Sequence, residues 1–172
     1  MLIQAGMAVG FAILLVVLVH SAISDVLSLR IPNGVLALGA VAFLPVAFSI
    51  GMPAAEIAAA VAVSLAVLAG GFVLFALKVI GGGDAKLAAV AVLWCGAGQA
   101  IPFLSNSVML GGLLALLLLA ARRLLHRYGS GRIRAIASLQ EGRREMPYGV
   151  ALALGGFTVL PHTAWALQFF KG

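Results

Sequence analysis

The chain has 172 residues, of which 63% are hydrophobic and only 9% are charged. This composition excludes an ordinary water-soluble domain and is typical of a protein whose helices cross a membrane several times. The net charge of +6 does not indicate nucleic-acid binding, because seven arginines are concentrated between residues 122 and 144. A short basic loop between apolar spans marks the cytoplasmic side and can lie against anionic lipid headgroups.

Stretches without Asp, Glu, Lys or Arg predict where the chain crosses the membrane, since one crossing needs about 20 apolar residues. The longest stretch has 35 residues and contains several polar residues near its middle, so we expect two short spans around a turn at 99–107. The prediction is an all-α membrane protein with six transmembrane helices in a single domain, residues 1–172. The spans are expected within residues 1–24, 34–55, 57–77, 87–121 (two spans) and 146–170, with an arginine-rich loop at about 122–146.

The positions of Lys and Arg orient these six spans. If the arginine-rich loop is cytoplasmic, the connections at 25–33 and 78–86 are cytoplasmic too, and the turns at 51–56 and 99–107 lie outside without any Lys or Arg. Ten of the eleven basic residues are then cytoplasmic, with Lys171 as the exception. Both termini are expected outside. A cleaved signal peptide is not expected, because no basic residue precedes the first apolar run.

Two of the five acidic residues fall at cytoplasmic span ends in this topology. Asp25 ends the first span, and Asp84 begins the fourth span directly after three glycines. Acidic groups at membrane depth are unfavourable and are often functional. If the first and fourth spans pack together, these two carboxylates can meet although they are far apart in the sequence.

Two close carboxylates do not readily ionise together, so one of them keeps a proton near neutral pH. The ionised group can accept a proton from an attacking water, and the protonated group can donate a hydrogen bond to a scissile carbonyl. The pattern therefore predicts an aspartic protease with Asp25 and Asp84 as the catalytic pair, without a metal or an organic cofactor. The glycine run is expected to form a flexible loop that lets an extended peptide approach Asp84.

Each of these residues also has a purely structural interpretation. Asp84 could cap the helix that follows it, where a negative charge suits the helix dipole. Asp25 could be an interfacial acid that pairs with Arg30 or Lys86, or that accepts a hydrogen bond from Ser21 one helical turn earlier. Lys86 could tune the carboxylate pair or extend to the lipid surface.

Three short blocks of sequence resemble the type IV prepilin peptidases, which are intramembrane aspartyl proteases with a GxGD motif. Gly81-x-Gly83-Asp84-x-Lys86-Leu87 is similar to the family's GxGDxKL block. Asp25 followed by Arg30-Ile31-Pro32-Asn33 is similar to its first-aspartate block, and Met146-Pro147-Tyr148-Gly149 to its third block. The blocks occur in the expected order over nearly the whole chain.

This resemblance implies that Asp25 and Asp84 are the catalytic residues and that Gly81, Gly83 and Lys86 belong to an active-site loop. It implies an enzyme of the bacterial inner membrane that removes the basic leader from a prepilin at the cytoplasmic face. Longer members of the family carry paired cysteines and also methylate the pilin. This chain begins directly with the first span and has no CxxC pair, so it resembles the short branch associated with tight-adherence (Flp-type) pili. Methylation, and with it S-adenosylmethionine, is not expected.

Two other classes of function are alternatives to the protease. A small proton- or cation-coupled transporter could be built from three spans plus three inverted spans. However, Asp25 follows the first span of its half and Asp84 precedes the first span of the other, so the two positions are not equivalent. A purely structural subunit of a pilus-assembly machine would need neither acid.

Overall fold

The computed structural model describes residues 2–128, 146–163 and 166. Within these residues the chain forms six α-helices and no strand, so the expected all-α class is confirmed for the part described. The helices are α1 (Leu2–Ser28), α2 (Asn33–Ser49), α3 (Ala54–Ala76), α4 (Gly82–Cys95), α5 (Ala100–Tyr128) and α7 (Tyr148–Val159). Two single-turn 3-10 helices, η1 (Ala97–Gln99) and η2 (Leu160–His162), follow α4 and α7.

Three helical segments are long and apolar enough to cross a membrane: Ile3–Ser28, Ala54–Ala76 and Ala97–Ala121. Two further apolar helices, Asn33–Ser49 and Tyr148–His162, are shorter. The remaining helix, α4, has 14 residues, which is about 21 Å at 1.5 Å per residue. Because a hydrocarbon core is about 30 Å thick, the crossing of the membrane by all six helices stays a prediction.

The chain divides within residues 87–121 as expected, but the break comes earlier than predicted. α4 ends at Cys95, and Gly96 has a φ of 85°, a left-handed conformation that favours glycine. Residues 100–107, expected to form a turn, are instead the first two turns of α5. Their polar groups are compatible with a helix, since Pro102 lies in the first turn and the Ser105 hydroxyl donates to the Ile101 carbonyl over 2.9 Å.

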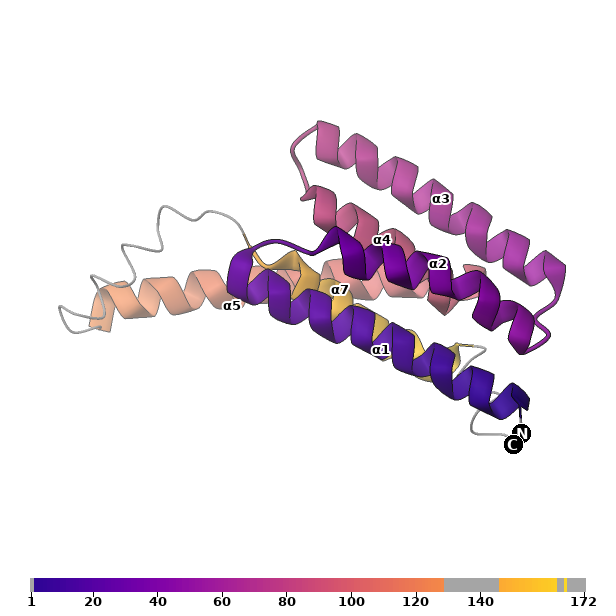
Figure 1. Cartoon of the computed structure of the whole chain (residues 1–172). Coiled ribbons are helices and arrows are strands. Elements are labelled where there is room, and N and C mark those ends of the chain that lie inside the picture. The colour runs from indigo at the N-terminus through magenta and orange to yellow at the C-terminus, as the bar shows by residue number, and fades with distance from the viewer. Residues whose placement is uncertain (1, 129–145, 164–165, 167–172) are drawn as a thin grey trace.

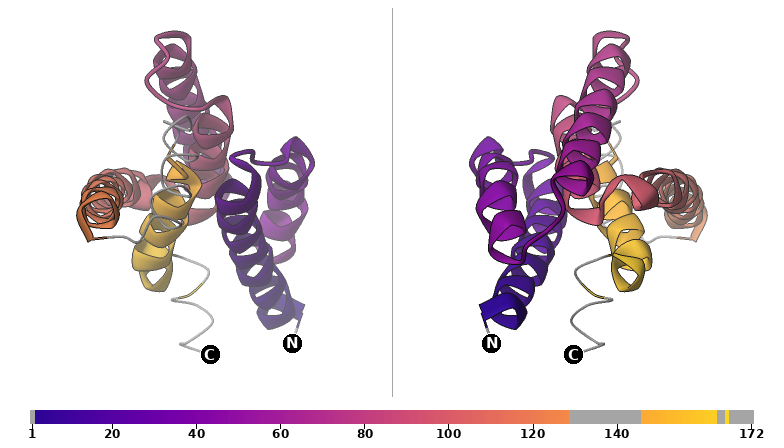
Figure 2. Two further views of the ribbon diagram at one scale, coloured as in Figure 1. Left: turned by 90° about the vertical axis from the view of Figure 1, so that its left-hand side faces the viewer. Right: turned by 90° about the vertical axis from the view of Figure 1, so that its right-hand side faces the viewer.

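The short helix α4 is the centre of the fold, and it contacts α1, α2, α3, α5 and α7. Every residue from Leu87 to Cys95 is buried, as expected for a helix that is apolar on all sides. The Ser64 hydroxyl of α3 donates to the Ala89 carbonyl over 2.8 Å. On another side, the Trp94 indole N–H donates to the Gly39 carbonyl of α2 over 2.9 Å. Figure 2 shows α3, α5 and the α1–α2 pair extending in different directions around this centre.

The end of α1 and the beginnings of α2, α4 and α7 lie at the same end of the bundle (Figure 1). At this end α5 continues past the other helices (Figure 1), and its 29 residues span about 44 Å. The loop predicted at about 122–146 is therefore helical as far as Tyr128, which corrects its boundary. Residues 129–145 of that loop lie outside the described part of the chain.

Candidate active site

Asp25 lies near the end of α1 and is buried, with 6% of its surface exposed. Its carboxylate Oδ2 accepts a hydrogen bond of 2.6 Å from the backbone N–H of Gly149, the second residue of α7. The first N–H groups of a helix have no partner within the helix and favour a negative charge. The N-terminus of α7 therefore stabilises an acid whose position at the end of α1 is unfavourable for the α1 dipole.

The hydrogen bond from Gly149 to Asp25 differs from those predicted for Asp25. The hydroxyl of Ser21 was expected to bond to it, but Ser21 is fully buried and makes no hydrogen bond within the described residues. Lys86, one of the two basic residues suggested as partners, donates a hydrogen bond to the Asn33 side chain. The hydrogen bond to Asp25 comes instead from Gly149, 124 residues further along the chain, so the predicted Ser21 bond was wrong.

Gly149 lies so close to Asp25 that a larger residue does not fit at position 149. A Cβ atom at position 149 would lie 2.8 Å from the Asp25 Oδ2 and 3.1 Å from its Cβ. Real Cβ atoms essentially never make contacts shorter than 3.0 Å. The third sequence block therefore has a direct role at the site, which the sequence analysis did not assign to any of its residues.

Asp84 is the third residue of α4, and Gly81 is the N-cap of that helix. Its carboxylate is hydrogen-bonded to the backbone N–H of Gly81, which is the arrangement of the returning half of a capping box. Gly83 and Lys86 therefore belong to the first turns of α4, and the flexible loop expected at residues 81–86 is corrected to a helix start. Asp84 does stabilise the beginning of its helix, although from the third helical position and not from the N-cap.

The glycines around Asp84 are required by close packing more than by backbone freedom, since Gly81 has an ordinary φ of −72°. A Cβ at Gly81 would lie 2.8 Å from the Asp84 Oδ2, and a Cβ at Gly83 would lie 3.2 Å from the Cβ of Ile31. The absence of a Cβ at Gly81 leaves room for the Asp84 carboxylate. The absence of a Cβ at Gly83 lets Ile31, in the segment before α2, pack against the beginning of α4.

Lys86 connects the GxGDxKL block to the first-aspartate block. Its Nζ donates a hydrogen bond of 2.9 Å to the Asn33 Oδ1 at the first position of α2. Both side chains line a groove between α2, α3 and α4, which is separate from the cavity beside Asp84. The lysine therefore holds two helix beginnings together next to the site.

Asp25 and Asp84 come from α1 and α4, and their carboxyl groups are close enough to interact electrostatically. Tyr148, the first residue of α7, also interacts with the charge of Asp84. Its ring packs against Gly111 of α5, where a Cβ would lie 2.5 Å from the ring Cε2. Tyr148 is therefore a site residue whose role is not predicted by the sequence block that contains it.

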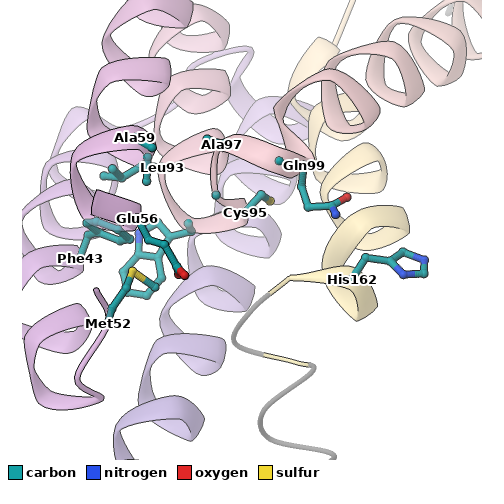
Figure 3. A pocket seen from close by; sticks show the side chains of 13 residues that line it. Phe43, Met52, Glu56, Ala59, Leu93, Cys95, Ala97, Gln99 and His162 are labelled. Atoms are coloured by element: carbon teal, nitrogen blue, oxygen red, sulfur yellow. The ribbon is translucent and has the colours of Figure 1, made fainter. Parts of the chain in front are cut away.

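A cavity of about 310 Å³ lies beside Asp84, between α3, α4, α5 and α7. A second cavity of about 330 Å³ contains Glu56, Cys95, Gln99 and His162 (Figure 3). In Figure 3 the His162 ring points away from Glu56. Among the residues that the structure describes, no three His, Cys, Asp or Glu side chains are grouped to hold a metal ion. Asp84, one member of the carboxylate pair, lines the first of these cavities.

The fold and the site together define a class: a strongly apolar helical bundle in which two carboxyl groups from distant parts of the chain lie close enough to interact electrostatically. The model of the type IV leader peptidase family matches residues 12–116, which is more than half of the chain and includes both aspartates. The chain therefore belongs to the type IV leader peptidase family, and the resemblance to prepilin peptidases is confirmed. No curated protein and no solved structure matched the chain.

Membership of this family supports a peptidase that acts on type IV leader sequences. The three long apolar helices support a membrane protein. The third sequence block, residues 146–149, lies outside the matched region, and its link to the site rests on the Gly149–Asp25 contact.

Proposed function

We propose that this protein is an aspartic endopeptidase that removes the basic leader from type IV prepilins of the Flp-like kind. The bond that it hydrolyses lies between the leader and the apolar helix of the prepilin, at the cytoplasmic face of the inner membrane. The proposal rests on two buried or half-buried carboxyl groups that are close enough to interact electrostatically, Asp84 at the beginning of α4 and Asp25 hydrogen-bonded to the first turn of α7. A capping role for Asp84 alone gives no reason for a second, buried carboxylate beside it.

The chemistry follows from two carboxyl groups that share one proton. The ionised group accepts a proton from a water molecule as the water oxygen bonds to the scissile carbonyl carbon. The protonated group donates a hydrogen bond to the carbonyl oxygen and stabilises its developing charge. Breakage of the carbon–nitrogen bond, with a proton delivered to the nitrogen, gives a new carboxyl end on the leader and a new amine on the pilin. Because the pair titrates as a unit, neither aspartate is assigned a fixed role.

The charges near the site support the cytoplasmic face. Arg30, Lys78 and Lys86 lie close in sequence to the two aspartates. Arg122 and Arg123 belong to the last two turns of α5, the helix that continues past the others at the same end of the bundle (Figure 1). Basic residues are enriched on the cytoplasmic side of membrane proteins. If the leader stays in the cytoplasm and the pilin helix is in the membrane, the scissile bond between them lies at the cytoplasmic surface of the membrane.

The experiment co-expresses a Flp-type prepilin with the wild type, Asp25→Asn or Asp84→Asn, and follows leader removal by gel mobility. Asparagine nearly keeps the shape of aspartate but does not titrate, so we expect each substitution to abolish processing while the protein still accumulates in the membrane. The matched control is Glu56→Gln, which removes an acid from the other cavity and should leave processing unchanged. Normal processing by either well-expressed asparagine variant would refute the carboxylate pair.

Flp-type specificity is tested by offering a longer, conventional type IV prepilin to the same strain. We expect the Flp-type prepilin to be processed faster, and mass spectrometry of its mature N-terminus to show no added methyl group. Equal processing of both prepilins would contradict the narrower substrate assignment, and a methylated product would contradict the absence of methyl transfer.

A further inference from the structure

We propose that the cavity beside Asp84 is the seat of the first turns of the substrate's apolar helix, which enters sideways between α3 and α5. This inference rests on the proposed function and adds the place where the membrane part of the prepilin binds. It commits to one occupant, the apolar segment that directly follows the scissile bond.

The walls of the cavity suit an apolar helix. Its polar side chains are Asp84 at the beginning of α4, Tyr148 and Ser107, and the other lining side chains are apolar or glycine. The α3 side of the cavity is formed by Val67, Gly70, Gly71 and Leu74, and the α5 side includes Val108. The cavity thus begins at a proposed catalytic carboxylate and continues along apolar helix faces.

The cavity is open between two helices that do not pack on each other. α3 packs mainly on α4, and α5 packs mainly on α7. Figure 2 shows α3 and α5 extending to different sides of the centre of the bundle. Leu74 of α3 and Val108 of α5 line the cavity and are 42% and 63% exposed. An apolar helix that diffuses in the membrane can therefore reach the cavity without passing through water.

The length of the cavity sets how much of the substrate it can hold. On α3 it extends from Val67 to Leu74, which is about 10 Å, or two helical turns. Ser107 is 1% exposed, and its hydroxyl makes no hydrogen bond within the described residues. A buried hydroxyl without a partner is unfavourable, and the first backbone N–H groups of the pilin helix have no partner within that helix, so such an N–H can donate the hydrogen bond that the Ser107 oxygen lacks.

Gly70 keeps the entrance free. A Cβ at Gly70 would have no heavy atom within 4 Å, whereas a Cβ at the neighbouring Gly71 would lie 2.8 Å from the Cβ of Ala85. Gly71 is thus needed for packing of α3 on α4, and Gly70 borders space that no described residue fills. An occupant that packs against Gly70 can approach the α3 backbone closely, as small residues allow between membrane helices.

The test is Gly70→Leu, with Gly112→Leu as the matched control. Both glycines are in helices and have open space around them, but only Gly70 lines the cavity. We expect Gly70→Leu to lower the rate of prepilin cleavage by about tenfold or more, mainly through a higher KM, as loss of a specific apolar contact does. We expect Gly112→Leu to keep the wild-type rate. A wild-type rate for Gly70→Leu would refute the proposal that the substrate helix binds in this cavity, and would favour lipid chains as its occupants.

A short peptide that spans the scissile bond but lacks the apolar helix separates the seat from the catalytic site. We expect Gly70→Leu to cleave this peptide as the wild type does, because the peptide does not use the seat. Loss of cleavage for both substrates would mean a damaged site and would contradict the inference. Cleavage of prepilin by Asp84→Asn would instead overturn the proposed function, so the two failures are distinguishable.

Crosslinking gives a readout that does not depend on cleavage. In the Asp84→Asn protein, a cysteine at Leu74 in the cavity is compared with a cysteine at Leu68, which lines the groove on the other side of α3. A prepilin with one cysteine in the two turns after the scissile bond should crosslink to position 74 and not to position 68. Equal crosslinking at both positions, or at position 68 alone, would refute the seat.

Discussion

Gly149→Ala perturbs the candidate site through a single methyl group. The added Cβ would lie 2.8 Å from the Asp25 Oδ2, about 0.6 Å closer than the 3.4 Å at which ordinary contact begins. The carboxylate is held there by a hydrogen bond of 2.6 Å from the Gly149 N–H. Since Asp25 is buried, the clash is relieved only by moving the carboxylate or the beginning of α7, and either movement weakens this bond.

The size of the effect follows from the bond that is lost. A hydrogen bond to a charged group contributes about 1.5–3 kcal/mol. If this stabilisation is lost in the transition state, the rate falls roughly 10- to 150-fold, because about 1.4 kcal/mol corresponds to a factor of ten. The catalytic groups remain present, so we expect a slow enzyme and not an inactive one.

The assay measures initial rates of prepilin cleavage by the purified protein in lipid nanodiscs, with helical content checked by circular dichroism. Gly34→Ala is the matched control. Gly34 is the second residue of α2, as Gly149 is of α7, and a Cβ at Gly34 meets no atom within 4 Å. We expect Gly34→Ala to keep the wild-type rate. If Gly149→Ala also cleaves at that rate, the Gly149–Asp25 contact does not position a catalytic group.

Two further substitutions test the packing around the site. Lys86→Met and Asn33→Ala should be non-additive in a double-mutant cycle of thermal unfolding in detergent, with a coupling of about 1 kcal/mol or less, because their hydrogen bond is exposed; strictly additive effects would contradict the bond. Gly71→Leu should destabilise the protein by about 1–3 kcal/mol through overpacking against Ala85. Gly70→Leu, one position away in open space, should leave the unfolding midpoint nearly unchanged, and equal losses for both variants would show that the two glycines do not differ in packing.

The helical class and most helix positions could be predicted because long apolar stretches have few alternatives in a membrane. The break between α4 and α5 lies earlier than the polar residues predict, because those residues do not form a turn. Ser105 satisfies its hydroxyl within the helix, and Pro102 falls where a helix tolerates proline. The actual break is at Gly96, which has a φ of 85°. In the sequence this glycine cannot be told apart from the many other glycines of the chain.

The two aspartates could be paired from topology, but their surroundings could not. Partners that are 124 residues apart, as for Asp25 and Gly149, leave no local pattern in one sequence. The glycine run predicts a flexible loop, because glycine leaves the backbone free to adopt many conformations. The close approaches at Gly81 and Gly83 depend on the packing of α4 against its neighbours, which only the folded chain defines.

The positions of the two carboxylates explain how like charges can share one apolar site. Asp25 accepts from the first turn of α7, and Asp84 accepts from the N-cap of its own helix, α4. Both therefore lie at helix N-termini, where unpaired N–H groups and the helix dipole favour negative charge. Because α4 and α7 are in contact, the two positive helix ends act on the pair together and offset part of its mutual repulsion. Groups fixed in this way need little reorganisation when charge moves between them and a substrate.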